Sequence, residues 1–270
     1  EVLQIKNTWD IFSLNDKAIQ EDFDLITEGR KSQPIPEGTR YLRKENIFIE
    51  EGAEIIFATL NASKGPIYIG KDTEIMEGSV VRGPFAMCKH SVLKLNTKIY
   101  GATTLGPYCK VGGEVNNSVL MGYSNKGHDG FLGNSVLGEW CNLGADTNNS
   151  NLKNNYAEVK LWDYETGRFA KTGLQFCGLM MGDHSKCGIN TMFNTGTVIG
   201  VSANVFGSGF PRNFIPSYSW GGASGFTEYK TNKVFEVAEV VMQRRNLVFD
   251  DKDQKILTHV FEETKKYRNY

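Results

Sequence analysis

The chain has 270 residues, of which 40% are hydrophobic and 23% charged, and its 30 Lys and Arg residues balance 31 Asp and Glu residues. It is long enough to bury a core as one large or two modest domains. Its near-zero net charge argues against a nucleic-acid binder. Neither a membrane span nor a signal peptide is visible in the sequence. The five cysteines are widely spread without a CxxC pair, which indicates reduced thiols in a cytoplasmic protein rather than disulfides or a zinc site.

Residues 1–46 precede any regular pattern and are expected to form a linker segment with one short helix. Asn15 is a suitable N-cap for that helix, and Gly29 is a suitable end. The apolar face of the expected helix consists of Ala18, Ile19, Phe23 and Ile26.

Apolar residues, most of them aliphatic, recur at every sixth position in two runs that begin at residues 69 and 181. The first run consists of Ile69, Ile75, Val81, Met87, Leu93, Ile99, Leu105 and Val111, and the second consists of Met181, Cys187, Phe193, Ile199 and Val205. This period fits neither a helix nor a plain alternating strand, whereas a coil with three short faces and about 18 residues per turn places one side chain of each face inside. Residues 47–217 are therefore predicted to form a left-handed parallel β-helix of about eight coils.

Two segments depart from the six-residue period. Residues 153–173 are expected to form a loop or hairpin that leaves the solenoid. Residues 218–270 are expected to form a C-terminal helical extension, because apolar residues there fall at helical spacing. Those residues are Val234, Val237, Ala238 and Val241, followed by Ile256, Leu257, Val260 and Phe261.

The flat faces of such a solenoid predict association with other copies of the chain. Partly apolar prisms commonly associate side by side, and closure around a three-fold axis buries one face of each. We therefore expect a homotrimer whose chemistry lies in the groove between two prisms, with side chains supplied by loops and corners. No nucleic-acid or membrane partner is expected.

His128 is the strongest candidate for chemistry among the four histidines. It lies in the Gly-rich stretch 124–133, which interrupts the six-residue register, and such polar breaks project side chains from a regular scaffold. An imidazole is a natural general base near neutral pH. His90, His184 and His259 are expected to be surface or structural residues.

Residues 142–151 form a second polar cluster, which is rich in amide and hydroxyl side chains. One interpretation is a ladder of Asn side chains along a corner of the solenoid. The other is a neutral hydrogen-bonding surface for a sugar, which presents many hydroxyl groups and no net charge.

At these residues the sequence resembles a known family. Residues 127–135 read GHDGFLGNS, residues 137–147 read LGEWCNLGADT and residues 149–152 read NSNL. They are similar to the acetyltransferase part of the bifunctional enzymes that make UDP-N-acetylglucosamine, whose pattern runs GHLTYLGD and then IGxxxNIGAGT. Residues 9–15, WDIFSLN, and 29–32, GRKS, resemble the linker of a bacterial branch of sugar-nucleotidyltransferase-like proteins.

The resemblance implies an acetyl-CoA-dependent N-acetyltransferase that acts on glucosamine 1-phosphate or a related amino sugar phosphate, in the synthesis of UDP-N-acetylglucosamine and cell-envelope precursors. His128 would be the general base that takes a proton from the attacking amine, and no metal would be required. The Gly-rich signature of the family's nucleotidyltransferase half is missing from this sequence. We therefore do not expect uridylyl transfer from this chain.

The same resemblance assigns binding roles by position. Asn142 and Asn151 would bind the sugar, and Lys94, or alternatively Arg82, would bind its phosphate. A backbone N–H near Ala145 would stabilise the oxyanion. The CoA would lie along the later coils, in contact with Gly188, Gly207 and Ser208, with Arg212 at one of its phosphates.

Three positions depart from the family pattern. Phe131 replaces a Tyr of the sugar pocket, Asn116 aligns with a phosphate-binding Lys, and Leu152 replaces a Tyr. These changes do not affect the proposed base or the residues expected to contact CoA. They leave the identity of the acceptor open, which could be another amino sugar phosphate or a sugar nucleotide.

Two other functions compete with acetyl transfer. The first is a non-catalytic β-helix that trimerises or regulates a sugar-phosphate nucleotidyltransferase, in which His128 would be dispensable. The second is a metal-dependent hydratase of the trimeric β-helix type, which needs clustered histidines. No two histidines are closer than His90 and His128, which lie 38 residues apart, so the sequence disfavours a hydratase.

Overall fold

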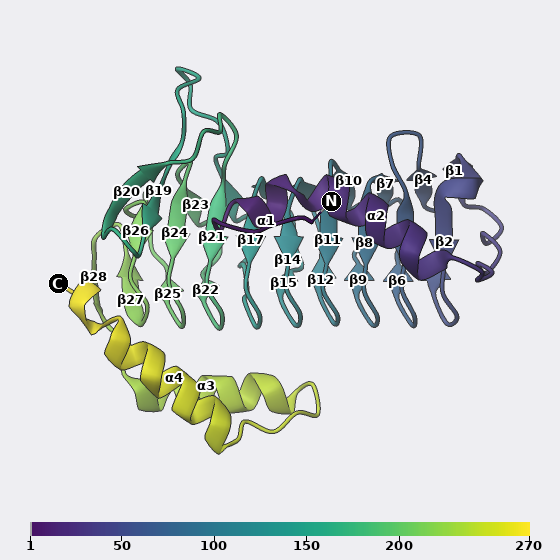
Figure 1. Cartoon of the computed structure of the whole chain (residues 1–270). Coiled ribbons are helices and arrows are strands. Elements are labelled where there is room, and N and C mark those ends of the chain that lie inside the picture. The colour runs from purple at the N-terminus through teal and green to yellow at the C-terminus, as the bar shows by residue number, and fades with distance from the viewer. Residues whose placement is uncertain (1) are drawn as a thin grey trace.

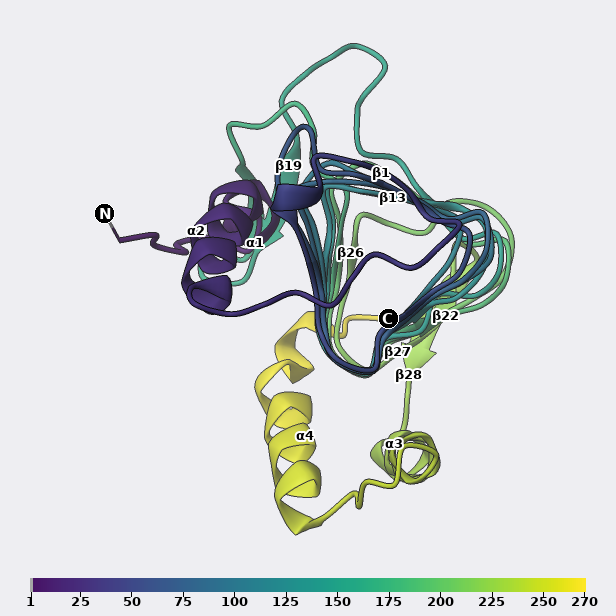
Figure 2. The same cartoon turned by 90° about the vertical axis from the view of Figure 1, so that its right-hand side faces the viewer.

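In the computed structural model, which describes residues 2–270, the chain winds into a triangular prism of parallel strands (Figures 1 and 2). Face A contains β1 (Arg40–Leu42), β4 (Thr59–Asn61), β7 (Val80–Arg82), β10 (Lys98–Tyr100), β13 (Glu114–Asn116) and β16 (Phe131–Gly133), and continues in the pair β18 (Asn148–Asn149) and β23 (Met192–Phe193). Face B is a nine-stranded sheet of β2 (Ile47–Ile49), β5 (Ile67–Ile69), β8 (Phe85–Met87), β11 (Thr103–Leu105), β14 (Val119–Leu120), β17 (Val136–Leu137), β21 (Leu179–Met181), β24 (Thr197–Ile199) and β26 (Phe214–Ile215).

Face C closes the triangle. Its first half contains β3 (Glu54–Ile55), β6 (Glu74–Ile75), β9 (Val92–Leu93), β12 (Lys110–Val111) and β15 (Asn125–Lys126), and its second half contains β22 (Lys186–Cys187), β25 (Asn204–Val205), β27 (Ser219–Gly222) and β28 (Gly225–Glu228). Asn142 joins the two halves because its backbone forms parallel bridges to Asn125 and to Lys186. Only β28 runs antiparallel to its neighbour on this face within residues 2–270.

The six-residue period corresponds to the inward side chains of this prism. Every residue of the first aliphatic run is at most 1% exposed, and every residue of the second run is at most 5% exposed. The predicted left-handed parallel β-helix is thus confirmed. It has about ten turns rather than the predicted eight.

The additional turns lie at the two ends of the solenoid. Strand β1 pairs in register with β4, so the parallel strands begin at Arg40, before residue 47. At the other end β27 and β28 extend face C to Glu228, beyond residue 217. All three residues of β1 are exposed, so no buried aliphatic side chain marked this strand in the sequence.

Five aromatic or imidazole rings stack along the corner between faces B and C, and we call them the aromatic ladder. The ladder consists of His90, Tyr108, Tyr123, Trp140 and His184, which all have a φ between 58° and 61°. Successive ring centroids are 4.7, 5.0, 4.2 and 6.2 Å apart. A left-handed backbone is unfavourable for such residues, and the stacking of their rings offsets part of that cost.

Two N-terminal helices, α1 (Asp10–Ser13) and α2 (Asn15–Thr27), lie along face B (Figure 1). The predicted N-cap was wrong, because Asn15 is the first helical residue and its side chain caps nothing. Its amide instead donates to the carbonyl oxygen of Ala102 at 3.0 Å and accepts from the hydroxyl of Thr104 at 2.8 Å. Both partners lie far along the chain, so Asn15 attaches the helix to the solenoid.

The segment after residue 153 leaves the prism as an antiparallel β-hairpin of β19 (Lys160–Asp163) and β20 (Arg168–Lys171). Near the C-terminus, α3 (Thr231–Gln243) and α4 (Asp251–Glu263) form a helical hairpin that straddles the corner carrying the aromatic ladder (Figure 2). Trp140 and Tyr218 of the solenoid pack in one buried cluster with side chains of both helices. The Tyr218 hydroxyl also donates to the carbonyl oxygen of Leu257 at 2.6 Å.

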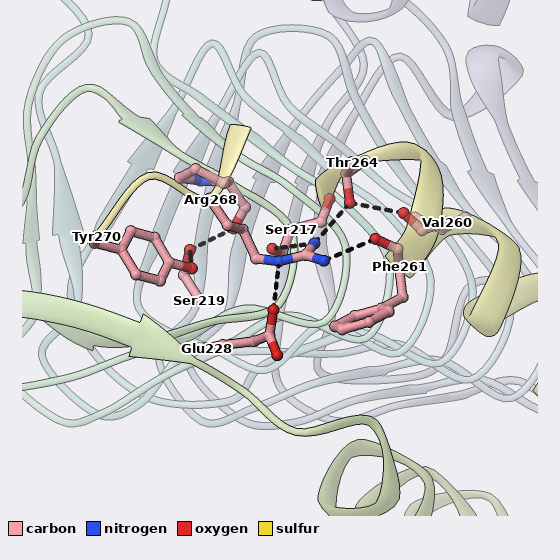
Figure 3. Close-up of polar contacts among 9 residues, drawn as sticks. Ser217, Ser219, Glu228, Val260, Phe261, Thr264, Arg268 and Tyr270 are labelled. Carbon is pink, nitrogen blue, oxygen red and sulfur yellow. Dashed lines mark hydrogen bonds and ion pairs between the residues drawn. The ribbon is translucent and has the colours of Figure 1, made fainter. Parts of the chain in front are cut away.

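Two 3₁₀ turns complete the elements, η1 (Lys44–Asn46) and η2 (Lys265–Tyr267). Beyond η2, Arg268 lies at the C-terminal end of the solenoid with a side chain only 2% exposed (Figure 3). Its guanidinium pairs with Glu228 at 3.0 Å and donates to the carbonyl oxygen of Phe261 at 2.9 Å. The chain's last residues are thereby attached to both the final strand and α4.

No helix within residues 2–270 is long and apolar enough to cross a membrane. The same residues contain no cluster of three metal-ligating side chains, and all five cysteines are free thiols.

Candidate active site

A cavity of about 660 Å³ lies between face C and the C-terminal end of α3. Its floor is the middle of face C, where Asn125 and Asn142 are neighbours, and its roof includes Val241, Arg244 and Arg245. A second hollow of about 520 Å³ adjoins it. The residues that line both hollows are Lys94, Gly127, His128 and Ala145.

His128 lies in the four-residue loop that carries the chain from β15 on face C to β16 on face A. Gly130 holds this loop against the next coil with a φ of +119°, and a Cβ on it would lie 2.2 Å from the carbonyl oxygen of Thr147. The His128 side chain is exposed toward the two hollows, and its imidazole makes no hydrogen bond or ion pair with any other described residue. The ring is therefore available to a ligand.

Lys126 anchors this loop from inside the solenoid. In register it follows Leu93 and Val111, whose side chains are fully buried, and it is itself only 2% exposed. Its ammonium donates to the carbonyl oxygen of His128 at 2.7 Å and to that of Gly112 at 2.9 Å. Burial lowers the pKa of Lys126 to about 8, because the charged form loses water.

Asn142 presents an unpartnered amide to the cavity. Its backbone is paired on both sides by the parallel bridges, so the position of its side chain is fixed by the sheet. The side chain is half-buried, and no other residue of the described chain hydrogen-bonds it. An amide held in this way can both donate to and accept from a ligand.

Ala145 offers a backbone N–H that donates to no partner within residues 2–270. Its carbonyl oxygen, by contrast, is taken by the backbone N–H of Asn190 at 2.8 Å. Because Ala145 lines both hollows, this N–H lies near the junction where two ligands could meet.

Five cationic side chains line the larger cavity: Lys94, Lys110 and Lys186 from the solenoid, and Arg244 and Arg245 from the end of α3. None of them forms an ion pair with a carboxylate among the described residues. Burial, and then the positive charges of Arg245, Lys94 and Arg244, lower the pKa of Lys110. This mutual repulsion makes the cavity attractive to an anion.

A row of glycines forms the corner between faces C and A. A Cβ on Gly144 would lie 2.4 Å from the backbone of Gly188, and one on Gly112 would lie 2.9 Å from the backbone of Gly127. A Cβ is therefore excluded at Gly112 and Gly144, and the half-buried glycines Gly127, Gly144 and Gly188 leave backbone partly accessible beside Ala145.

The cavity thus brings together His128, Asn142, Ala145 and Lys94 from the residues that the sequence singled out, with Gly188 next to them. Asn116, Phe131 and Asn151 lie apart from it on face A, around Gly133. The Asn151 amide donates to the side chain of Asn134 at 2.8 Å, and Asn116 donates to the carbonyl oxygen of Tyr100 at 3.2 Å.

The other sequence candidates also lie outside the cavity. Arg82 is exposed on β7 of face A. Gly207 and Ser208 lie in an exposed bend after β25, and Arg212 packs over the ring of Phe226 at 5.8 Å. None of these four residues lines either of the two hollows.

Sequence reasoning missed Lys110, Lys186, Arg244, Arg245 and Lys126. The two arginines follow a helix, where cations are common for helix-dipole reasons alone, so their position gave no signal. Lys126 did give one, because it occupies a hexad position between Leu120 and Leu132, where every neighbour in register is apolar.

Residues 1–31 match a family described as sugar nucleotidyl transferase. No curated protein sequence matches the chain. The solved structure of the polysialic acid O-acetyltransferase OatWY is similar over 73% of this chain and 82% of its own, with 13% identity and a TM-score of 0.32. That of the polySia-specific acetyltransferase NeuO is similar over 71% of this chain and 82% of its own, with 8% identity and a TM-score of 0.26. The geometry of the cavity therefore carries the functional assignment.

Proposed function

We propose that this chain is an acetyl-CoA-dependent acyltransferase that N-acetylates an amino sugar phosphate, with glucosamine 1-phosphate as one candidate. The observation that carries the proposal is the junction of the two hollows, where an unpartnered imidazole and an unpartnered backbone N–H lie together. A transfer between two substrates needs such a meeting point for a base and an oxyanion donor.

In the proposed reaction the acceptor amine attacks the carbonyl carbon of the thioester. His128 takes one proton from the amine nitrogen as the N–C bond forms, because a nitrogen that keeps that proton would leave again. The carbonyl oxygen becomes an oxyanion and accepts a hydrogen bond from the Ala145 N–H. The C–S bond then breaks, and the thiolate of CoA takes the proton that His128 holds.

Charges around the two hollows support an acceptor with both an amine and a phosphate. Asp129 and Asp146 line the smaller hollow and favour a basic nitrogen. The cations of the larger cavity favour phosphate, and Asn142 can bind a sugar hydroxyl between the two.

The glycine corner is the proposed track for acetyl-CoA. Partly accessible backbone along Gly144 and Gly188 matches a ligand whose pantetheine arm carries amide groups. No metal is needed for this transfer, because the His128 imidazole would act as the base and the Ala145 N–H would stabilise the oxyanion.

We also propose that the protein works as a homotrimer. Four large apolar side chains of face A are between 38% and 57% exposed, and they are Tyr41, Leu42, Val80 and Tyr100. Apolar surface of this kind on a flat sheet favours association with another copy. Light scattering coupled to size-exclusion chromatography tests it, and a monomer would overturn it.

The experiment that tests the activity is a thiol-release assay with acetyl-CoA and a panel of amino sugars. The panel contains glucosamine, glucosamine 1-phosphate, glucosamine 6-phosphate and a nucleoside-diphosphate-linked glucosamine. Release of CoA with at least one phosphorylated member supports the proposal. If every acceptor fails and acetyl-CoA does not bind, the non-catalytic regulatory β-helix is the better assignment.

A further inference from the structure

We infer that the end of α3 completes a diphosphate-binding subsite in the larger cavity, formed by Arg244 and Arg245 together with Lys94 and Lys110. The ligand would be a diphosphate ester, either the nucleoside diphosphate of a sugar nucleotide or the diphosphate of CoA. This inference deepens the proposed acetyl transfer and rests on it for the identity of the ligand, whereas the subsite itself is argued from the cavity that the four cations line and from their free donors.

The four cations lie within electrostatic reach of one another. All four side chains line the larger cavity, and the positive charges of Arg245, Lys94 and Arg244 lower the pKa of Lys110 after burial does, so these groups face a common space. Lys186 is excluded from the subsite, because three strand spacings of face C, about 14 Å, separate its backbone from that of Lys110.

The guanidinium groups of the two arginines have nearly all their donors free. Arg245 makes one long hydrogen bond, of 3.4 Å, to the Asn125 side chain, and Arg244 makes none within residues 2–270. A guanidinium has five N–H donors in a planar fork that fits phosphate oxygens in pairs. Two such forks in one cavity suit a ligand with two adjacent phosphate groups.

The number and spacing of the free donors favour a diphosphate over a monophosphate. A sugar monophosphate carries at most two negative charges and three free oxygens on one phosphorus. A diphosphate diester carries about the same charge but offers more oxygens over a longer span, so that cations from both walls of the cavity can contact it. The helical hairpin is held on the solenoid by the buried cluster around Trp140 and by the Tyr218–Leu257 hydrogen bond, so the arginines after α3 are placed before the ligand arrives.

Calorimetric titration of the full-length protein tests the subsite, with inorganic pyrophosphate and orthophosphate as the first probes. We expect pyrophosphate to bind at least 10-fold more tightly than orthophosphate. The double variant R244Q/R245Q should weaken pyrophosphate binding at least 10-fold. The control K252Q/K255Q removes the same charge from α4, outside this cavity, and should bind as the wild type does.

UDP and CoA, titrated in the presence of pyrophosphate, distinguish the two sources. Competition by UDP assigns the subsite to a sugar nucleotide, and competition by CoA alone assigns it to the acyl donor; either supports the subsite. Absence of pyrophosphate binding, or equal loss in both double variants, overturns it. These binding measurements do not depend on turnover. If pyrophosphate does not bind but the protein still releases thiol from acetyl-CoA, the subsite is wrong and the proposed acetyl transfer is unaffected.

Discussion

The ammonium of Lys126 donates a 2.7 Å hydrogen bond to the carbonyl oxygen of His128, so a buried charge holds the backbone of the proposed base. The side chain reaches from an inward position of face C to the loop two residues further along. Its second bond, to Gly112, ties the same loop to the preceding coil. Because a charge in an apolar core is costly, its presence at this one rung points to a benefit in the loop.

The stability of the fold should depend on pH through Lys126. Its pKa of about 8 in the folded protein lies below the ordinary value of 10.5, so between these values the unfolded chain binds more protons than the folded one. The free energy of unfolding should therefore rise with pH across this window, by about 3 kcal/mol for this group alone. Lys126→Met should remove that rise.

Comparison of the wild type with Lys126→Met isolates the contribution of Lys126 to the pH dependence of stability. Burial raises the pKa of the Cys109 and Cys141 thiols to about 12, so their deprotonation in the unfolded chain lowers stability at high pH in both proteins. Denaturant melts of both proteins at pH 7 and pH 10 give the change in the free energy of unfolding between the two pH values. If wild type and Lys126→Met change in parallel, the proposed cost of the buried ammonium is contradicted.

Lys126→Met should also impair catalysis while preserving the fold. Without the two hydrogen bonds the loop would shift, and a misplacement of about 1 Å can cost about 10²-fold in rate. We expect kcat to fall while the KM for acetyl-CoA changes little. Hydrogen exchange of residues 124–133 should become faster in the variant, and unchanged exchange there would argue against a positioning role.

His128→Ala should lower acetyl transfer by about 10²–10⁴-fold, because a general base contributes about that much. The matched control is His259→Ala, since His259 is an exposed histidine of α4 that lies outside both central hollows. Thiol release under saturating acetyl-CoA measures both variants. Equal activity of the two variants would remove His128 from the mechanism.

Asn142→Ala should raise the KM for the sugar acceptor about 5-fold, because one neutral hydrogen bond is worth about 1 kcal/mol. The KM for acetyl-CoA should be unchanged. Asn151→Ala serves as the comparison, because Asn151 is engaged with Asn134 on face A and lies outside the cavity. A larger effect at Asn151 than at Asn142 would move the sugar site to face A.

The hexad period predicted the solenoid because each inward position demands one aliphatic side chain, as Ile69 and Val111 show. Exposed strands carry no such demand, and β1 was missed for that reason. The break at 124–133 located the loop of His128, since irregular sequence in a repeat marks a departure from the coil. Arg244 and Arg245 could not be assigned, because their role depends on where a helix beyond the repeats folds back.

The chain's last residues also decide where the solenoid stops. Arg268 holds the tail against Glu228 of β28, and that strand runs opposite to its neighbour β27. A parallel rung from another molecule would therefore meet a reversed strand at this end of face C. A growing stack of identical parallel rungs is the architecture of a fibre, and this reversal opposes such growth.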